Sequence, residues 1–228
     1  MVIFIFFCIF AVAEQKYTMS EKGKKRYKLL LFAAIAIVAC VCIALSLFGK
    51  GDKDCQHYDE ILYPTQNYSR SLANDVEGVI LHHTALPTLQ RSLDMRTLPK
   101  NIVSTHCVID TDGTRYILAD PGIVTFHAGK SVLNGRERCN EFTLGVEFQG
   151  NTQEKPLTDN QINSAVEYLV PIIREYNIPM ANIVTHEMIR TNYMTTHPED
   201  TIVKDKCDIT KPEYKRVMEA LTAQIADN

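Results

Sequence analysis

The longest unbroken hydrophobic stretch of the chain lies near its N-terminus, at residues 29–48, where no position carries a charge, proline or glycine. About 20 apolar residues are what a helix needs to cross the hydrocarbon core of a bilayer. Five basic residues precede the stretch (Lys22, Lys24, Lys25, Arg26, Lys28), whereas residues 49–54 are nearly balanced in charge. Because basic loops remain cytoplasmic, we expect the N-terminus in the cytoplasm and the rest of the chain beyond the membrane.

This anchor divides the chain into four expected parts: a cytoplasmic segment (1–28), a transmembrane anchor (29–48), a linker (49–58) and a globular domain (59–228). Met19 begins a complete signal-anchor pattern, so residues 1–18 are given no role and whether they are translated stays open. A second mode of anchoring also stays open. Residues 37–40 resemble a lipoprotein cleavage box, in which Cys40 is the acylated residue.

Beyond the anchor, short apolar runs alternate with segments of helical periodicity. Buried strands are predicted where the runs are short and β-branched (76–81, 142–148, 183–185), and an Asp-Gly turn between 107–109 and 114–118 predicts a hairpin. Helices are predicted at 89–97, at 212–225 and after the capping box of Thr158 and Gln161, with Pro171 ending or kinking the last of these. The fold class is therefore α/β, a central mixed β-sheet flanked by helices, with an N-terminal transmembrane helix.

Charge and cysteine content narrow the class of function. A formal net charge of −3 with 22% charged residues leaves no basic excess for phosphate contacts, so nucleic acid is not an expected partner. Four cysteines follow the apolar N-terminal region (Cys55, Cys107, Cys139, Cys207), and none forms a CxxC pair, which argues against a closed four-cysteine zinc site. We expect Cys107 and Cys139 to be buried free thiols.

Polar side chains with metal-binding or acid–base chemistry follow the predicted strands. His82 and His83 come directly after the first of them, His186 follows residues 183–185, and Glu147 lies between Val146 and Phe148. Two histidines and a carboxylate are the ligands of a catalytic zinc that keeps one position open for water. A carboxylate within an apolar strand is costly unless it serves a polar or metal-linked role, so Glu147 is a candidate catalytic residue.

A longer set of motifs resembles one known family, the type 2 N-acetylmuramoyl-L-alanine amidases, which include the peptidoglycan recognition proteins. The motifs are Val-Ile-Leu-His-His-Thr-Ala at 79–85, Ser-Thr-His-Cys-Val-Ile at 104–109, Phe-His-Ala-Gly at 126–129, Gly-Arg-Glu-Arg-Cys-Asn at 135–140 and Lys-Cys-Asp at 206–208. The third and fourth are most similar to the anhydromuropeptide-amidase branch. The resemblance covers residues 76–210.

The resemblance implies a hydrolase that cuts the amide bond between N-acetylmuramic acid and L-alanine in peptidoglycan or muropeptides. It implies zinc (Zn²⁺) bound by His82, His186 and Asp208, with Glu147 as general base and Lys206 as oxyanion stabiliser. His127, Arg138 and Asn140 are expected to bind substrate. Together with the anchor, this places the catalytic domain in the periplasm, on a single-pass protein of the inner membrane.

Two points of the resemblance leave alternatives. The family continues past the aspartate with Pro-Gly, whereas Ile209-Thr210-Lys211-Pro212 follows here, so the adjacent Cys207 remains a competing third ligand. A module on the same fold that binds peptidoglycan without cutting it is the alternative function. Such modules lose a ligand histidine, and this chain has both.

Overall fold

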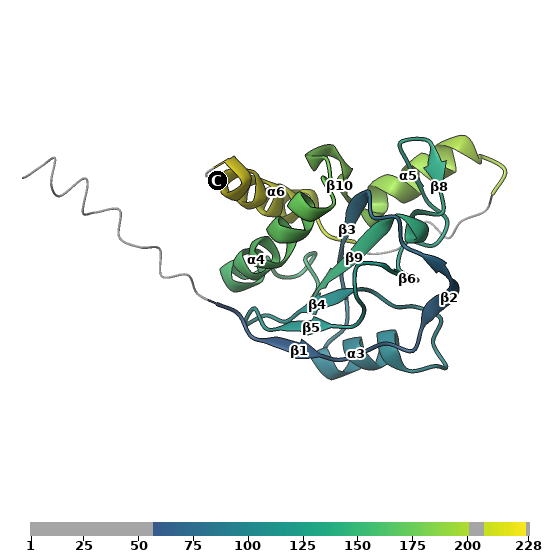
Figure 1. The fold of residues 1–228 in the computed structure, drawn as a ribbon. Coiled ribbons are helices and arrows are strands. Elements are labelled where there is room, and N and C mark those ends of the chain that lie inside the picture. Colours follow the sequence, from purple (N-terminus) through teal and green to yellow (C-terminus); the bar gives the residue numbers. More distant parts are fainter. Residues whose placement is uncertain (1–56, 201–207, 227–228) are drawn as a thin grey trace, which may run out of the picture. The chain divides into compact units, whose positions relative to one another are not determined.

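The computed structural model describes residues 57–200 and 208–226 (Figure 1), and residues from His57 onward form one compact unit. Within these ranges no helix is both long enough and apolar enough to cross a membrane. The anchor expected at 29–48, the lipoprotein Cys40 and most of the linker lie outside the described residues. Lys206 and Cys207 lie outside them as well.

A six-stranded mixed sheet forms the centre of the molecule, in the order β1-β5-β4-β9-β3-β10. Parallel pairing joins β1 to β5, β4 to β9, β9 to β3 and β3 to β10, while β4 and β5 form the antiparallel hairpin that the Asp-Gly turn predicts. These six strands are β1 (Glu60–Leu62), β3 (Gly78–His83), β4 (Cys107–Ile109), β5 (Arg115–Ile117), β9 (Thr143–Phe148) and β10 (Ile183–Thr185). Two small antiparallel pairs accompany them: β2 (Tyr68–Ala73) with β6 (Ile123–Thr125), and β7 (Val132–Leu133) with β8 (Arg136–Glu137).

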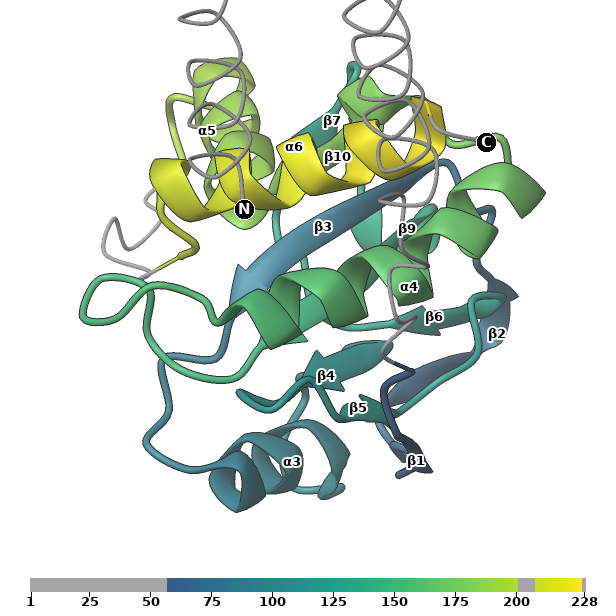
Figure 2. The ribbon, with the colours of Figure 1, turned by 90° about the vertical axis from the view of Figure 1, so that its left-hand side faces the viewer.

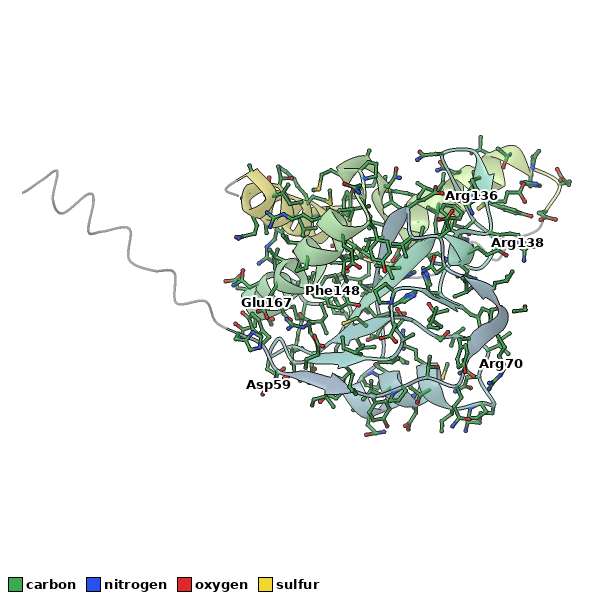
Figure 3. The ribbon with its side chains drawn as sticks, viewed as in Figure 1. Asp59, Arg70, Arg136, Arg138, Phe148 and Glu167 are labelled. Atoms are coloured by element: carbon green, nitrogen blue, oxygen red, sulfur yellow. The ribbon has the colours of Figure 1, made fainter. Side chains whose placement is uncertain are left out.

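Two long helices, α4 (Asp159–Glu175) and α6 (Lys211–Ala226), lie side by side over one face of this sheet (Figure 2). Alternate residues of β3 and β9 point into the core below these helices, among them Leu81, Val146 and Phe148, none of which has exposed surface. Figure 3 shows Phe148 in the middle of the molecule. This face is the main hydrophobic core.

The opposite face is covered by α5 (His186–Thr196) and α3 (Leu89–Thr97). Its apolar content is smaller, in one cluster around Ile80, Phe142 and Ile189 and another around Leu93 and Val108. Because side chains alternate along a strand, His82 and Glu147 point to this face. The mixed sheet flanked by helices is therefore confirmed, and its two faces differ in chemistry.

Several elements differ from the sequence prediction. The helix that the capping box of Thr158 and Gln161 starts does not end at Pro171; it continues to Glu175, because Ile172 and Ile173 are buried in the core. The strand predicted at 76–81 is shifted to Gly78–His83, so the two histidines belong to it. His186 begins α5, and neither this helix nor β1 nor β2 was predicted. Cys107 and Cys139 are buried free thiols, as expected.

Candidate active site

The two candidate zinc histidines meet at the carboxyl edge of adjacent parallel strands. Thr185, the last residue of β10, pairs with Leu81 of β3, so the residues that follow each, His186 and His82, lie side by side. Their ring centroids are 5.2 Å apart, and both residues are buried. Two segments 104 positions apart in the sequence thus place imidazoles together, and the parallel register accounts for it.

The hydrogen bonds around these rings allow the position of each ring proton to be assigned. His127 Nε2 lies 3.4 Å from the carbonyl of Thr143, which can only accept, so neutral His127 is protonated at Nε2 and its Nδ1 accepts. His82 Nε2, 3.3 Å from that Nδ1, is therefore the donor. His186 Nε2 likewise donates to the carbonyl of Ala128 at 3.0 Å. With this assignment of the ring protons, the lone pair of His82 and of His186 is on Nδ1, the form in which an imidazole nitrogen binds a metal.

Two neighbours, Gly145 and Asn140, hold His127 where its Nδ1 can accept the hydrogen bond from His82. At Gly145 in β9, a Cβ atom would lie 2.6 Å from His127 Cγ and 2.8 Å from its Nδ1, so the ring rests directly on the glycine backbone. Asn140 Oδ1 accepts from the backbone N–H of His127 at 3.0 Å and of Ala128 at 2.7 Å. Asn140 therefore orients the loop whose carbonyl holds His186.

Glu147 is the register partner of His82 across β3 and β9, so the two side chains share a face of the sheet. Its Oε2 atom lies 2.6 Å from Nη2 of Arg96, and each side chain is only 10% exposed. The guanidinium is itself anchored, since Nη1 donates to the carbonyl of Ser92 at 3.0 Å. Glu147 is thus a buried carboxylate beside the histidines, balanced by a buried cation from α3.

Arg96 was not among the residues that the sequence singled out. A signal was present, because the apolar residues Leu89 and Leu93 set the buried face of the helix at 89–97 and position 96 continues it. A basic residue on the apolar face of a helix needs an acidic partner in the interior. Glu147 was the carboxylate that the sequence already placed in a buried strand, so the two could have been paired.

Asp208 approaches the same place from the start of α6. It is buried, its Oδ2 accepts from the N–H of Glu187 at 2.5 Å, and its Oδ1 accepts from the N–H of Ile209 at 2.8 Å. Asp208 and His186 line one cavity of about 640 Å³. Each of these two bonds uses one acceptor position of the carboxylate, which has about four.

These residue types match the chemistry of a catalytic zinc: two neighbouring imidazoles, and a carboxylate that lines the cavity beside one of them, His186. Across residues 57–200 and 208–226, however, no three His, Cys, Asp or Glu side chains converge closely enough to form a complete metal site. The two histidines fit the metal, and the third ligand is not in place among the residues described.

Three further polar residues, His83, His106 and Arg138, lie outside the group formed by His82, His186 and Glu147. His83 points to the opposite face from His82, as the strand alternation predicts, and its Nδ1 lies 2.8 Å from Thr152 Oγ1. His106 is fully buried, donating through Nε2 to the carbonyl of Ile123 and accepting from the N–H of Gly145. Burial lowers the pKa of each to about 4. Arg138 lies at the edge of the molecule (Figure 3), mostly exposed and ion-paired with Glu141.

The chain matches one family model and several known proteins. The family model described as N-acetylmuramoyl-L-alanine amidase matches residues 72–200. The 1,6-anhydro-N-acetylmuramyl-L-alanine amidase AmpD of Haemophilus influenzae is 32% identical over 132 residues, which are 49% of this chain and 70% of that protein. In the AmpD of Enterobacter cloacae, 37% identical over 89 residues, the alignment spans 46% of the relative's length.

Solved structures show the same fold. A selenomethionine derivative of AmpD superimposes with a TM-score of 0.54 at 20% identity, covering 72% of this chain and 97% of that one. The family match spans more than half of the chain, and the H. influenzae relative is aligned over more than two thirds of its length. The chain therefore belongs to the N-acetylmuramoyl-L-alanine amidase family, on its anhydromuropeptide-amidase branch.

Proposed function

We propose that this protein hydrolyses the amide bond between N-acetylmuramic acid and L-alanine in peptidoglycan or muropeptides, with zinc as its cofactor. The observation that carries the proposal is the pair His82 and His186, whose rings lie 5.2 Å apart with Glu147 in register beside His82. A module that only binds would not need two metal-ready imidazoles next to a buried carboxylate.

His82, His186 and Asp208 would hold the metal, with Cys207 as the alternative third ligand. Zinc held by these residues would supply a Lewis acid, which would lower the pKa of a bound water molecule. Glu147 accepts the proton of the attacking water and then delivers it to the leaving amine of L-alanine. Arg96 orients the carboxylate during both transfers, because the 2.6 Å ion pair holds Oε2 in place. Lys206, placed by the sequence motif alone, supplies positive charge where the oxyanion develops.

The hydrogen bonds made by the second ring nitrogen of His82 and of His186 support metal binding. His127 accepts from His82, and the carbonyl of Ala128 accepts from His186, so each ligand ring is fixed by its second nitrogen. Such supporting hydrogen bonds set the tautomer and raise the basicity of the ligating nitrogen. We assign His127 and Asn140 to this support. Arg138, exposed at the rim, is retained as a substrate-binding candidate.

The test uses the full chain, purified in detergent and reconstituted with zinc, and a muramoyl peptide as substrate. The account predicts a new free amine on L-alanine, detected by amine labelling and mass spectrometry, which disappears in His82→Ala and His186→Ala. Binding of the muramoyl peptide without any release of amine, in a zinc-loaded sample, would instead support the recognition-module alternative.

We also propose that the chain is held at the inner membrane by residues 29–48, with the amidase domain in the periplasm. The support is the length of the apolar stretch and the basic cluster before it. A reporter that is active only in the periplasm, fused after Asn228, should be active, and a cytoplasmic reporter silent; the reverse pattern contradicts the orientation. Cys40→Ser separates the two modes of anchoring by fatty-acid labelling, since only a lipoprotein carries an acyl group that the substitution removes.

A further inference from the structure

Arg190, on α5, is an arginine whose donors are not satisfied by the protein. Its Nε and Nη2 atoms are buried, and within residues 57–200 and 208–226 neither has a hydrogen-bond partner. Buried donors without partners are rare and costly in folded proteins, so each calls for a physical explanation. A ligand that supplies the missing acceptors is one such explanation.

Two other arginines, the buried Arg115 and the partly exposed Arg216, donate hydrogen bonds to several acceptors of the protein. Arg115 donates to Glu60, Glu167, Ser164 and the carbonyl of Tyr58. Arg216 donates to the carbonyl of Leu157 and to Asp159 and Glu213. Arg96 also has one buried donor without a hydrogen-bond partner in the described part of the chain, Nε, while its Nη1 donates to the carbonyl of Ser92. Arg190 differs because two of its buried donors, Nε and Nη2, have no partner among the described residues.

Arg190 lines the same cavity of about 640 Å³ as His186 and Asp208. On α5, residues 186, 190 and 194 are spaced by four, so His186, Arg190 and Met194 form one stripe along the helix, and all three line the cavity. One helical turn rises about 5.4 Å, and an extended peptide spans about 3.3–3.6 Å per residue. A group one or two residues from an amide bond held at His186 is thus within reach of Arg190.

The chemistry of the unsatisfied edge identifies the ligand. Nε–H and one N–H of Nη2 point in the same direction on one edge of the planar guanidinium, at the spacing of the two oxygens of a single carboxylate. Glu187 and Asp208 line the same cavity, but neither accepts a hydrogen bond from Nε or Nη2 of Arg190. The two oxygens of Asp208 accept from the backbone N–H groups of Glu187 and Ile209.

We propose that Arg190 is a specificity-determining residue that binds a carboxylate of the stem peptide, one or two residues beyond the scissile amide on its amine side. The inference rests on the proposed amidase function for the identity of the ligand. It adds a substrate preference: peptides that carry a carboxylate at this position bind better than those in which it is a carboxamide.

The experiment measures binding before it measures catalysis. Two muramoyl peptides that differ only in having a carboxylate or a carboxamide at the second residue are titrated by calorimetry into the full-length protein stripped of zinc, which cannot turn them over. The wild type should bind the carboxylate form about 10- to 100-fold more tightly, the range expected for a charged hydrogen-bonded pair. Arg190→Met should abolish the difference by weakening only the carboxylate form, and Arg190→Lys should retain part of it.

Lys211→Met is the matched control, because Lys211 is a cation that lines the same cavity but is exposed. It should keep the preference if Arg190 acts by direct contact. Equal binding of the two peptides by the wild type, or a preference that survives Arg190→Met, would overturn the proposal. Loss of the proposed function gives a separate result, since zinc-loaded wild type would then bind peptide with an Arg190-dependent preference and release no amine.

Discussion

The two faces of the central sheet are made from the same strands and are buried to a similar extent, but their chemistry differs. Toward α4 and α6, β3 and β9 present Leu81, Val146 and Phe148, and the face is an apolar core. Toward α3 and α5 they present His82 and Glu147, each contacting another buried polar side chain. Burial alone does not separate core from active site in this protein; the polar network on one face does.

The sharpest test of this contrast compares two neighbours that point to opposite faces. Glu147→Gln removes the general base and should lower turnover on a muramoyl peptide by roughly 10²- to 10⁴-fold. Phe148→Ala opens a cavity in the apolar core and should lower the free energy of unfolding by about 3–5 kcal/mol while folded molecules remain active. Steady-state kinetics and urea unfolding on both variants check the pair. Near wild-type turnover in Glu147→Gln would remove this residue from the mechanism.

The next largest effect is expected on the free energy of unfolding when the ion pair between Arg96 and Glu147 is broken. Arg96→Met leaves the carboxylate buried without its cation and should cost about 3–5 kcal/mol of stability. Glu147→Gln keeps a hydrogen-bond acceptor and should cost less, about 1–3 kcal/mol. The double variant should be more stable than the sum of the single losses implies, because neither charge is then left alone. Strictly additive losses in urea unfolding would show that the two side chains are not coupled.

Sequence patterns located the polar face only in part. His82, His186 and Glu147 could be found because each lies in or directly after an apolar strand, and the parallel register then brings them together. Arg190 could not be assigned a role, since a basic residue on a short helix is normally solvated and only the structure shows that its Nε and Nη2 atoms are buried. For Arg96 the helical spacing from Leu89 and Leu93 indicated a buried position, but the partner Glu147 is shown only by the tertiary contact.

The helices and strands could likewise be predicted only where local sequence signals determine them. Leu89–Thr97, the hairpin and the capping box at Thr158 were predicted because local signals set them. The continuation of α4 past Pro171 and the strand β1 depend on packing between distant segments. Asn140 illustrates the same limit for function: the motif suggested substrate binding, while its Oδ1 holds the backbone of His127 and Ala128.

A smaller effect, on zinc affinity, is expected at Gly145, where the ring of His127 packs against a residue without a side chain. Gly145→Ala places a Cβ 2.6 Å from His127 Cγ, so the ring must move and its hydrogen bond to His82 Nε2 weakens. Zinc affinity should fall by about 10- to 100-fold, as is typical when support for a ligand is lost. Competition with a fluorescent chelator measures it. Leu144→Val in the same strand, which points to the apolar core, is the control and should leave zinc affinity unchanged.

The smallest effect concerns pH. Burial lowers the pKa of His106 to about 4, below its ordinary value near 6.5, so the unfolded chain takes up a proton first as the pH falls. Stability from this group is complete above pH 6.5 and is lost between pH 6.5 and 4, by about 1–2 kcal/mol from pH 7 to pH 5. Urea unfolding of zinc-free protein across this range tests it. His106→Gln, which keeps a donor for the Ile123 carbonyl, should make the pH dependence shallower, whereas an unchanged slope would contradict the assignment.

The central claim is that the polar face is a zinc site, and the zinc content of the purified protein tests it most directly. Full-length protein reconstituted with zinc and freed of excess metal should contain about one zinc ion per chain by elemental analysis. His82→Ala and His186→Ala should retain almost none, because two remaining ligands hold zinc poorly, while His83→Ala should stay near one. A folded wild-type sample with less than about a tenth of an equivalent, or with zinc that survives loss of either His82 or His186, would contradict the account.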